Sequence, residues 1–523
     1  MKLKSLAIAC AMMAAGSSFA AGTVTISGVP HQVVYFGGAT APDNFLNDIA
    51  TGVLTGITYY VAPNYRAFAG AANGVPGVAN GTRVLFIKRS AGGSVFGVNP
   101  VARAQRVKTI DVNNCATTNT VDGIANTPVD GSTPKLAFPC AVVGVDPGEA
   151  NHAAANNAGL VIDFGVSDVE PAMFAGPLNT ENDTPALAPN EVARMRVQPV
   201  NQLMMGLAAT NTVPDTTLFS RSTYGAMLNG QITTWDQVDE SLSGDVVVCR
   251  RVEGSGTQTS YNWFFGNFPC SANEGGFVEP ARMTSSFGWK TSGTGTTADP
   301  FIIDPSAGYT VIENSSSGNV RSCMQAANAG TDYTFTSWDP ETASTKTFKV
   351  PFSSTGPVKA IATLSLDSYT GTNGWSFRNL DGVGTFDAST QTPSANATGI
   401  FPSKENLIKG RYDFVVELSI QDRSVAVTNE QGDVVPAIAG VQKAFADEIV
   451  RRSGSPRFTG NFDNSGAQVS TPFAFASLPQ FYAGLTDTNG SEVDGNGVRW
   501  ADRYVSKFTR EANTCSPLKF FGN

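Results

Sequence analysis

The sequence predicts an α/β fold with a largely parallel sheet, and three observations support this prediction. Short β-branched runs, typical of buried strands, alternate with helix-like stretches. Each run continues into a loop that contains glycine or serine. The 523 residues include 32 Phe, 12 Tyr and 6 Trp, which is enough for a core despite 53 Gly and 29 Pro. We therefore expect one large or two medium globular domains.

The predicted elements follow in chain order. The β-branched runs predict strands at residues 23–26, 83–87, 161–164 and 246–248. The spacing of apolar residues predicts helices at residues 43–53, 221–228, 257–265 and 437–452. Tracts rich in Gly, Ser, Thr and Asn are too polar for a core, so we expect surface loops, irregular strands or insertions at residues 113–134, 284–317 and 389–398.

The N-terminus has the features of a secretory signal. Basic Lys2 and Lys4 precede an apolar run at residues 6–15, and small residues follow it. We expect cleavage near Ala20/Ala21 and a periplasmic or secreted product; the alternative is a buried N-terminal helix. No later stretch reaches the roughly 18 apolar residues of a membrane span, so the mature chain is expected to be soluble.

Charge and histidine content argue against several classes of function. The chain has 35 basic and 44 acidic residues, a net charge of -9, which disfavours a nucleic acid or an anionic membrane as partner. An anionic ligand would need a local site. The two histidines, His31 and His152, lie in no ligand spacing, so we expect no metal and no histidine-based catalysis. We expect no cofactor and no enzymatic activity.

Six cysteines follow the signal segment, and none forms a C-x-x-C pair. An even number in an exported chain predicts disulfides rather than zinc or redox chemistry. From proximity in the sequence alone, the expected pairs are Cys115–Cys140, Cys249–Cys270 and, by elimination, Cys323–Cys515.

Four segments combine glycine and hydroxyl residues at a switch from strand to helix, where backbone N–H groups can face an anion. They are residues 36–42, 89–94, 163–168 and 250–257. Taken singly, such a segment is more often a turn whose hydroxyl caps a helix.

In this order, the four segments resemble those of the phosphate-binding proteins of bacterial ABC importers, in the type II periplasmic binding-protein superfamily. That family carries a Gly-Ala-Thr loop, a Gly-Ser-x-Gly-Gly loop, an Asp-Phe-Gly-x-Ser-Asp segment and an Arg-x-Asp-Gly-Ser-Gly-Thr segment. Residues 230–235 are similar to its Gly-Lys-Ile-x-x-Trp turn. The resemblance implies a two-lobed fold with a cleft between the lobes, phosphate or a related oxyanion as ligand, and an ABC permease as partner.

The resemblance also implies that each lobe has insertions. The expected organisation is a signal peptide at 1–21, lobe 1 at 22–197 plus 408–523 with an insertion at about 95–160, and lobe 2 at 198–407 with insertions at about 266–398. Arg89 stands where the family has a glycine. It could intrude on the pocket, face outward as a solvated cation, or serve a larger anion.

Carried over by position, the ligand contacts of the family fall on Thr40, Ala41, Ser90, Asp168, Arg251, Ser255, Gly256 and Thr257. Hydroxyl and helix-start N–H groups would hold the oxyanion by dipoles, and Arg251 would add a forked charged contact. An ionised Asp168 only accepts hydrogen bonds, which favours hydrogen phosphate or arsenate over sulfate; the alternative is an N-cap. Glu253 would hold Arg251 in place, or else form a solvated ion pair.

The leading hypothesis is therefore an exported, monomeric solute-binding protein whose two lobes close on phosphate for ABC-type uptake. One alternative is a secreted structural or adhesive protein that keeps the fold and has lost the ligand, motivated by the polar insertions. The other is a phosphate-ester hydrolase, for which the sequence offers neither a metal cluster nor an activated nucleophile with a base.

Overall fold

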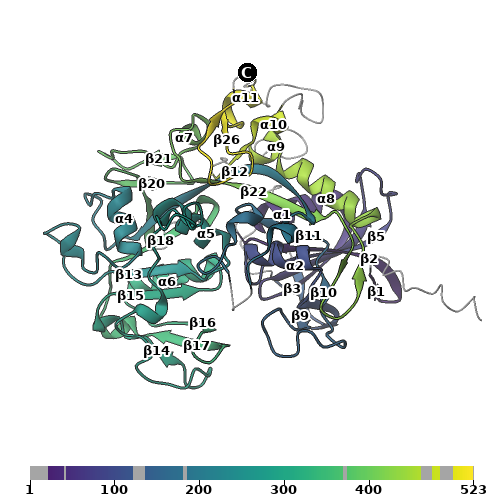
Figure 1. The fold of residues 1–523 in the computed structure, drawn as a ribbon, viewed down its shortest axis with the longest axis horizontal. Coiled ribbons are helices and arrows are strands. Elements are labelled where there is room, and N and C mark those ends of the chain that lie inside the picture. The colour runs from purple at the N-terminus through teal and green to yellow at the C-terminus, as the bar shows by residue number, and fades with distance from the viewer. Residues whose placement is uncertain are drawn as a thin grey trace, which may run out of the picture.

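The computed structural model describes residues 22–40, 43–121, 136–180, 185–368, 374–460, 474–482, 497 and 499–521. The predicted signal segment and Ala41 lie outside these ranges. In Figure 1 the elements form two groups that lie side by side. The first group contains β1–β11, α1, α2 and α8, and the second contains β13–β21 and α4–α6. Strands β12 (Met195–Thr210) and β22 (Val415–Arg423) run between the two groups (Figure 1).

A parallel three-stranded core lies in the first group. Its strands, in order, are β5 (Arg83–Arg89), β2 (Val29–Gly38) and β11 (Phe164–Ser167). Strand β2 is almost continuously buried from its third residue because it lies inside the sheet. Its neighbours on the flanks are β1 (Thr23–Ile26), β4 (Tyr65–Ala72), β3 (Leu54–Ala62) and β9 (Leu136–Val143). Helix α8 (Gly440–Ser453) packs on this core, with the Phe445 ring 6.3 Å from that of Phe86.

Shorter elements complete the first group and its surroundings. They are α1 (Asp43–Val53), α2 (Asn99–Arg103), β6 (Arg106–Val107), β7 (Thr109–Cys115), β8 (Thr120–Val121), β10 (Leu160–Val161), α3 (Pro189–Val192), β23 (Val427–Thr428) and β24 (Val434–Val435). Of these, α2, β6, β7 and β8 lie in the predicted insertion at about 95–160.

A second parallel core lies in the second group. Its strands, in order, are β15 (Thr310–Asn314), β13 (Val247–Arg251) and β18 (Ala360–Ser365). Helix α5 (Gly256–Gly266) follows β13 and helix α6 (Ser317–Ala329) follows β15. The other elements of this group are α4 (Arg221–Leu228), β14 (Phe301–Ile302), β16 (Tyr333–Asp339), β17 (Ser344–Val350), β19 (Trp375–Arg378), β20 (Thr385–Asp387) and β21 (Thr392–Pro393).

The long strand β12 makes the two cores one curled sheet. Its first half pairs with β22 and with β25 (Phe475–Ser477), and its second half pairs with β18 and β19. Strand β22 also pairs with β11. All of these pairings are antiparallel. In the part of the chain that is described, no helix is long and apolar enough to cross a membrane.

The predicted α/β class is confirmed, but the prediction of a largely parallel sheet is wrong. Parallel pairing dominates only in the two cores, because hairpins such as β3–β4 and β16–β17 place consecutive strands antiparallel. The helices at 43–53 and 221–228 have the predicted bounds. The predicted strand at 161–164 is instead split between β10 and β11. The tract 284–317 contains β15, whose five residues were hidden among polar ones.

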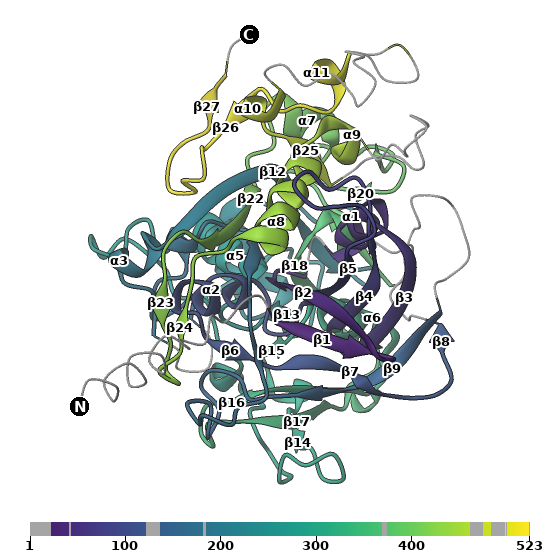
Figure 2. The same cartoon turned by 90° about the vertical axis from the view of Figure 1, so that its right-hand side faces the viewer.

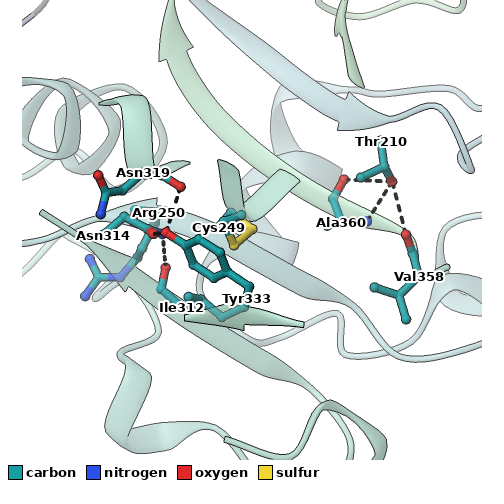
Figure 3. The surroundings of a disulfide bond; sticks show 10 residues. Thr210, Cys249, Arg250, Ile312, Asn314, Asn319, Tyr333, Val358 and Ala360 are labelled. Carbon is teal, nitrogen blue, oxygen red and sulfur yellow. Dashed lines mark hydrogen bonds between the residues drawn. A yellow bond between two sulfur atoms is a disulfide. The ribbon is translucent and has the colours of Figure 1, made fainter. Parts of the chain in front are cut away.

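Of the three predicted disulfides, Cys115–Cys140 is confirmed and the other two are wrong. The actual pairs are Cys249–Cys323 and Cys270–Cys515. Helix α6 lies over β13 and brings Cys323 to Cys249, although 74 residues separate them (Figure 3). The Cys270–Cys515 disulfide bonds the C-terminal segment to the loop after α5.

The C-terminal elements gather at one end of the molecule, above β12 and β22, in both views (Figures 1 and 2). They are α7 (Lys404–Ile408), α9 (Pro456–Thr459), α10 (Pro479–Tyr482), α11 (Trp500–Arg503), β26 (Phe508–Thr509) and β27 (Lys519–Phe520). Residues 508–515, here named the C-terminal strap, contact both groups. Thr514 donates from N and Oγ1 to Glu170, which follows β11, at 2.6 and 2.5 Å. Cys515 is bonded to Cys270 of the second group.

Candidate functional site

The carboxyl ends of the two parallel cores point to a common region, which is where ligands bind in open α/β sheets. Each core strand is followed by a polar residue. In chain order these residues are Thr40 after β2, Ser90 after β5, Asp168 after β11, Arg251 at the end of β13, Ser317 after β15 and Asp367 after β18. Three come from each group, so the site is shared between the groups.

Arg251 joins the two groups. Its side chain is only 2% exposed, and its Nη1 lies 3.3 Å from Thr40 Oγ1 and 3.2 Å from Ser317 Oγ. Its Nε donates to the carbonyl of Asn314 and its Nη2 to that of Ser315, at 3.2 and 2.9 Å. These contacts orient the guanidinium towards the first group.

Tyr333 fixes the loop that holds Arg251. Its hydroxyl lies 2.6 Å from Asn314 Oδ1 and 2.9 Å from the carbonyl of Asn319, and Asn314 Nδ2 donates to the Ile312 carbonyl at 2.9 Å (Figure 3). The Cys249–Cys323 disulfide lies beside this network (Figure 3). The end of β15 is therefore rigidly attached to β13 and α6.

Asp168 meets the start of α5. Ser255 caps this helix and accepts from the N–H of Gln258 at 3.4 Å, while the N–H groups of Gly256 and Thr257 are not used within the helix. Thr257 Oγ1 lies 3.5 Å from Asp168 Oδ2. A Cβ on Gly256 would lie 2.7 Å from the same oxygen, so only a glycine allows this approach.

The surroundings of Asp168 act on the pKa of its carboxyl in opposite directions. Burial raises its pKa to about 6, and the nearby charge of Arg251 and a hydrogen bond with Ser94 act in the opposite direction. Ser94 Oγ also accepts from the Asp168 N–H at 3.3 Å. Among the described residues, Asp168 Oδ1 has no hydrogen-bond partner. One carboxylate oxygen is thus buried and able to accept.

A buried lysine behind Ser90 was missed by the sequence analysis. Lys88 Nζ lies 3.0 Å from Ser90 Oγ and 3.3 Å from Asp43 Oδ1, and Ser90 donates to the same Asp43 oxygen at 2.7 Å. The carbonyls of Gly38 and Ala39 accept from Lys88 at 3.2 and 3.1 Å. Burial lowers the pKa of Lys88, and Asp43 opposes this effect. The available signal was a lysine directly after the apolar run 84–87 of a predicted buried strand.

Arg89 does not face outward as a solvated cation. It is 1% exposed and forms a forked ion pair with Asp146, with its two terminal nitrogens 2.8 and 2.9 Å from the two carboxylate oxygens. The same guanidinium donates to Tyr65 Oη at 2.9 Å. Asp146, which compensates the buried charge of Arg89, belongs to the predicted insertion.

Glu253 forms an ion pair with Arg282, at 3.4 Å, and its predicted support of Arg251 stays a prediction. Burial raises the pKa of Glu253 to about 7, against the charges of Arg250 and Arg282. The carbonyls of the β15–α6 loop orient Arg251 from the other side.

Both histidines make hydrogen bonds to other parts of the protein. His31 Nδ1 lies 2.9 Å from the Val29 carbonyl, and the His152 ring lies between Glu430 Oε2 and the Arg106 carbonyl, at 3.0 and 2.7 Å. Within the described ranges, no group of three or more His, Cys, Asp or Glu residues is arranged to hold a metal ion.

No family model matches the chain, and no curated protein matches it. Among solved structures, it is similar to an ancestral soluble variant of the human phosphate binding protein, at 12% identity and a TM-score of 0.37, over 84% of this chain and 90% of that one. It is also similar to a high-affinity periplasmic phosphate-binding protein, PfluDING, at 13% identity and a TM-score of 0.34, over 82% and 99%. A third is PstS from Borrelia burgdorferi, at 11% identity and a TM-score of 0.29, over 80% and 92%.

Proposed function

We propose that the protein binds hydrogen phosphate where the ends of the two parallel cores meet. The observation that carries the proposal is that Arg251, from one core, reaches Thr40 after the other, while Asp168 meets the first turn of α5. A tetrahedral oxyanion needs donors from several directions, and these elements supply donors from both groups.

The chemistry of the site favours an oxyanion that carries a proton. Arg251 and Lys88 supply positive charge, and the starts of α5 and α6 add N–H groups and the positive ends of two helix dipoles. Asp168 Oδ1 is a buried acceptor without a partner in the described structure. It can accept the proton of hydrogen phosphate, whereas sulfate has none to offer.

We also propose that the protein works outside the cytoplasm, as the solute-binding component of an importer. Three disulfides are typical of a chain that folds in an oxidising compartment. In this proposal the two groups are the lobes, and ligand contacts from both lobes favour the closed form, which a permease recognises.

One observation favours the second candidate, a structural or adhesive protein without a ligand. The polar groups of the site already satisfy one another in part, since Arg251 contacts two hydroxyls and two carbonyls. Calorimetric titration of the full mature chain with phosphate, and with sulfate as the comparison, separates the two. Submillimolar phosphate binding supports the proposal, and no heat with either anion supports the second candidate.

The variant Asp168→Asn tests the proposed basis of selectivity. Its amide can donate to sulfate and no longer repels it, so the preference for phosphate over sulfate should fall by about tenfold to a hundredfold, the value of a charge-assisted hydrogen bond. Asp163→Asn is the matched control, because Asp163 is also a buried carboxyl but lies at the opposite end of β11 and accepts from the Tyr35 N–H at 2.7 Å. An unchanged preference in Asp168→Asn would remove this role.

A further inference from the structure

A second carboxyl group lies at the end of β18, which the sequence analysis did not connect with the site. Asp367 belongs to the short turn Leu366–Ser368 that directly follows this strand. In the parallel register of β13 and β18, Val248 lies opposite Ile361. Because β13 and β18 run parallel, Asp367 after β18 and the loop that leads from β13 into α5 lie at the same edge of the sheet.

The turn that carries Asp367 is attached to α6. Arg321 Nη1 donates to the carbonyl of Ser368 at 3.2 Å, and the hydroxyls of Ser365 and Ser368 lie 3.3 Å apart. The first residue of the same helix, Ser317, contacts Thr40 and Arg251. Asp367 is 9% exposed, and among the described residues its Oδ1 has no hydrogen-bond partner.

The groups around Asp367 disfavour its negative charge. Burial raises its pKa to about 8, and the charges of Asp168 and Asp43 in the first group act in the same direction. A hydrogen bond with Ser365 and the charge of Arg321 act in the opposite direction. A pKa of about 8 favours the protonated carboxyl at neutral pH, and a protonated carboxyl is a hydrogen-bond donor.

We propose that Asp367 is a second specificity-determining residue of the site, whose protonated carboxyl donates a hydrogen bond to an unprotonated oxygen of the bound oxyanion. This inference rests on the proposed phosphate site. Asp168 accepts a hydrogen bond from the ligand and Asp367 donates one to it. The two carboxyl groups together therefore recognise an oxyanion that has one protonated and one unprotonated oxygen. A carboxyl that loses its proton would instead repel the anion.

The test is calorimetric titration of the full mature chain with inorganic phosphate from pH 6.5 to 9.5. Asp367→Asn keeps a neutral donor that cannot ionise, and Asp367→Leu removes the donor. Between pH 7 and 9 the protonated fraction of Asp367 falls about tenfold, so the Kd of the wild type should rise about tenfold relative to that of Asp367→Asn. Asp367→Leu should bind at least about tenfold more weakly at pH 7. Thermal unfolding confirms that each variant is folded.

The outcomes separate this inference from the function on which it rests. Asp163→Asn removes another buried carboxyl and should keep the pH profile of the wild type. If the wild type binds phosphate and its pH profile coincides with that of Asp367→Asn, the role of Asp367 is overturned and phosphate binding stands, even if Asp367→Leu does not fold. If the wild type binds neither phosphate nor sulfate, both proposals fail.

Discussion

Gly256→Ala tests the closest approach between the two groups. The added Cβ would lie 2.3 Å from Ser94 Oγ and 2.7 Å from both Cβ and Oδ2 of Asp168. Neither neighbour can withdraw freely, because both are buried and the Asp168 N–H donates to Ser94. Such overpacking costs about 1–3 kcal/mol. If the contact forms without ligand, we expect this loss in the free energy of unfolding; if it forms only in the bound state, the phosphate Kd should instead rise about 5- to 150-fold.

Urea unfolding and calorimetric titration measure these two effects. Gly225→Ala is the matched control, because a Cβ there would lie 3.5 Å from its nearest neighbour, Phe265, which is an ordinary contact. Since Gly225 lies within α4, its replacement should stabilise the protein by about 0.5–1 kcal/mol. If Gly256→Ala unfolds like the wild type and binds phosphate with the same Kd, α5 does not pack against Asp168 as described.

Two further predictions concern buried charges away from the ligand. Asp146→Ala leaves the Arg89 guanidinium buried and unpaired, so the free energy of unfolding should fall by about 3–5 kcal/mol with no change in the phosphate Kd; unchanged stability would contradict the ion pair. Lys404 donates to the Thr459 carbonyl at 2.9 Å, and burial lowers its pKa to about 7. Between about pH 7 and pH 10.5, Lys404 carries its proton only in the unfolded chain. The free energy of unfolding of the wild type therefore rises with pH in this range. Lys404→Met should therefore raise the Tm most below pH 7, and a gain that is independent of pH would refute this explanation.

The residues that the sequence located are those with a local signature. Asp168, Arg251 and Ser255 lie where a strand gives way to a loop or helix, and the glycines beside them mark that switch. The structure brings these residues together with Thr40, which supports the convergence predicted from separate segments. What each residue binds remains a prediction that the titrations above address.

Two residues that the sequence did not locate, Ser317 and Asp367, take their positions from pairing between distant strands. Ser317 reaches Arg251 because β15 pairs with β13, and Asp367 lies at the same edge of the sheet because β18 pairs with β13. A short polar tract carries no sequence signal that it will lie beside a particular distant strand. The same reason explains the wrong disulfides, since Cys323 faces Cys249 only once α6 has packed on β13. Proximity in sequence worked for Cys115 alone, where β7 and β9 form a local antiparallel pair.

The C-terminal strap constrains how the molecule can open. The Cys270–Cys515 bond holds its two Cα atoms 5.3 Å apart, and the adjacent Thr514 is hydrogen-bonded to Glu170. While both links persist, the first and second groups cannot move apart at the C-terminal strap. A movement of one group against the other that keeps both links is therefore a rotation about the strap, not a separation of the groups as a whole.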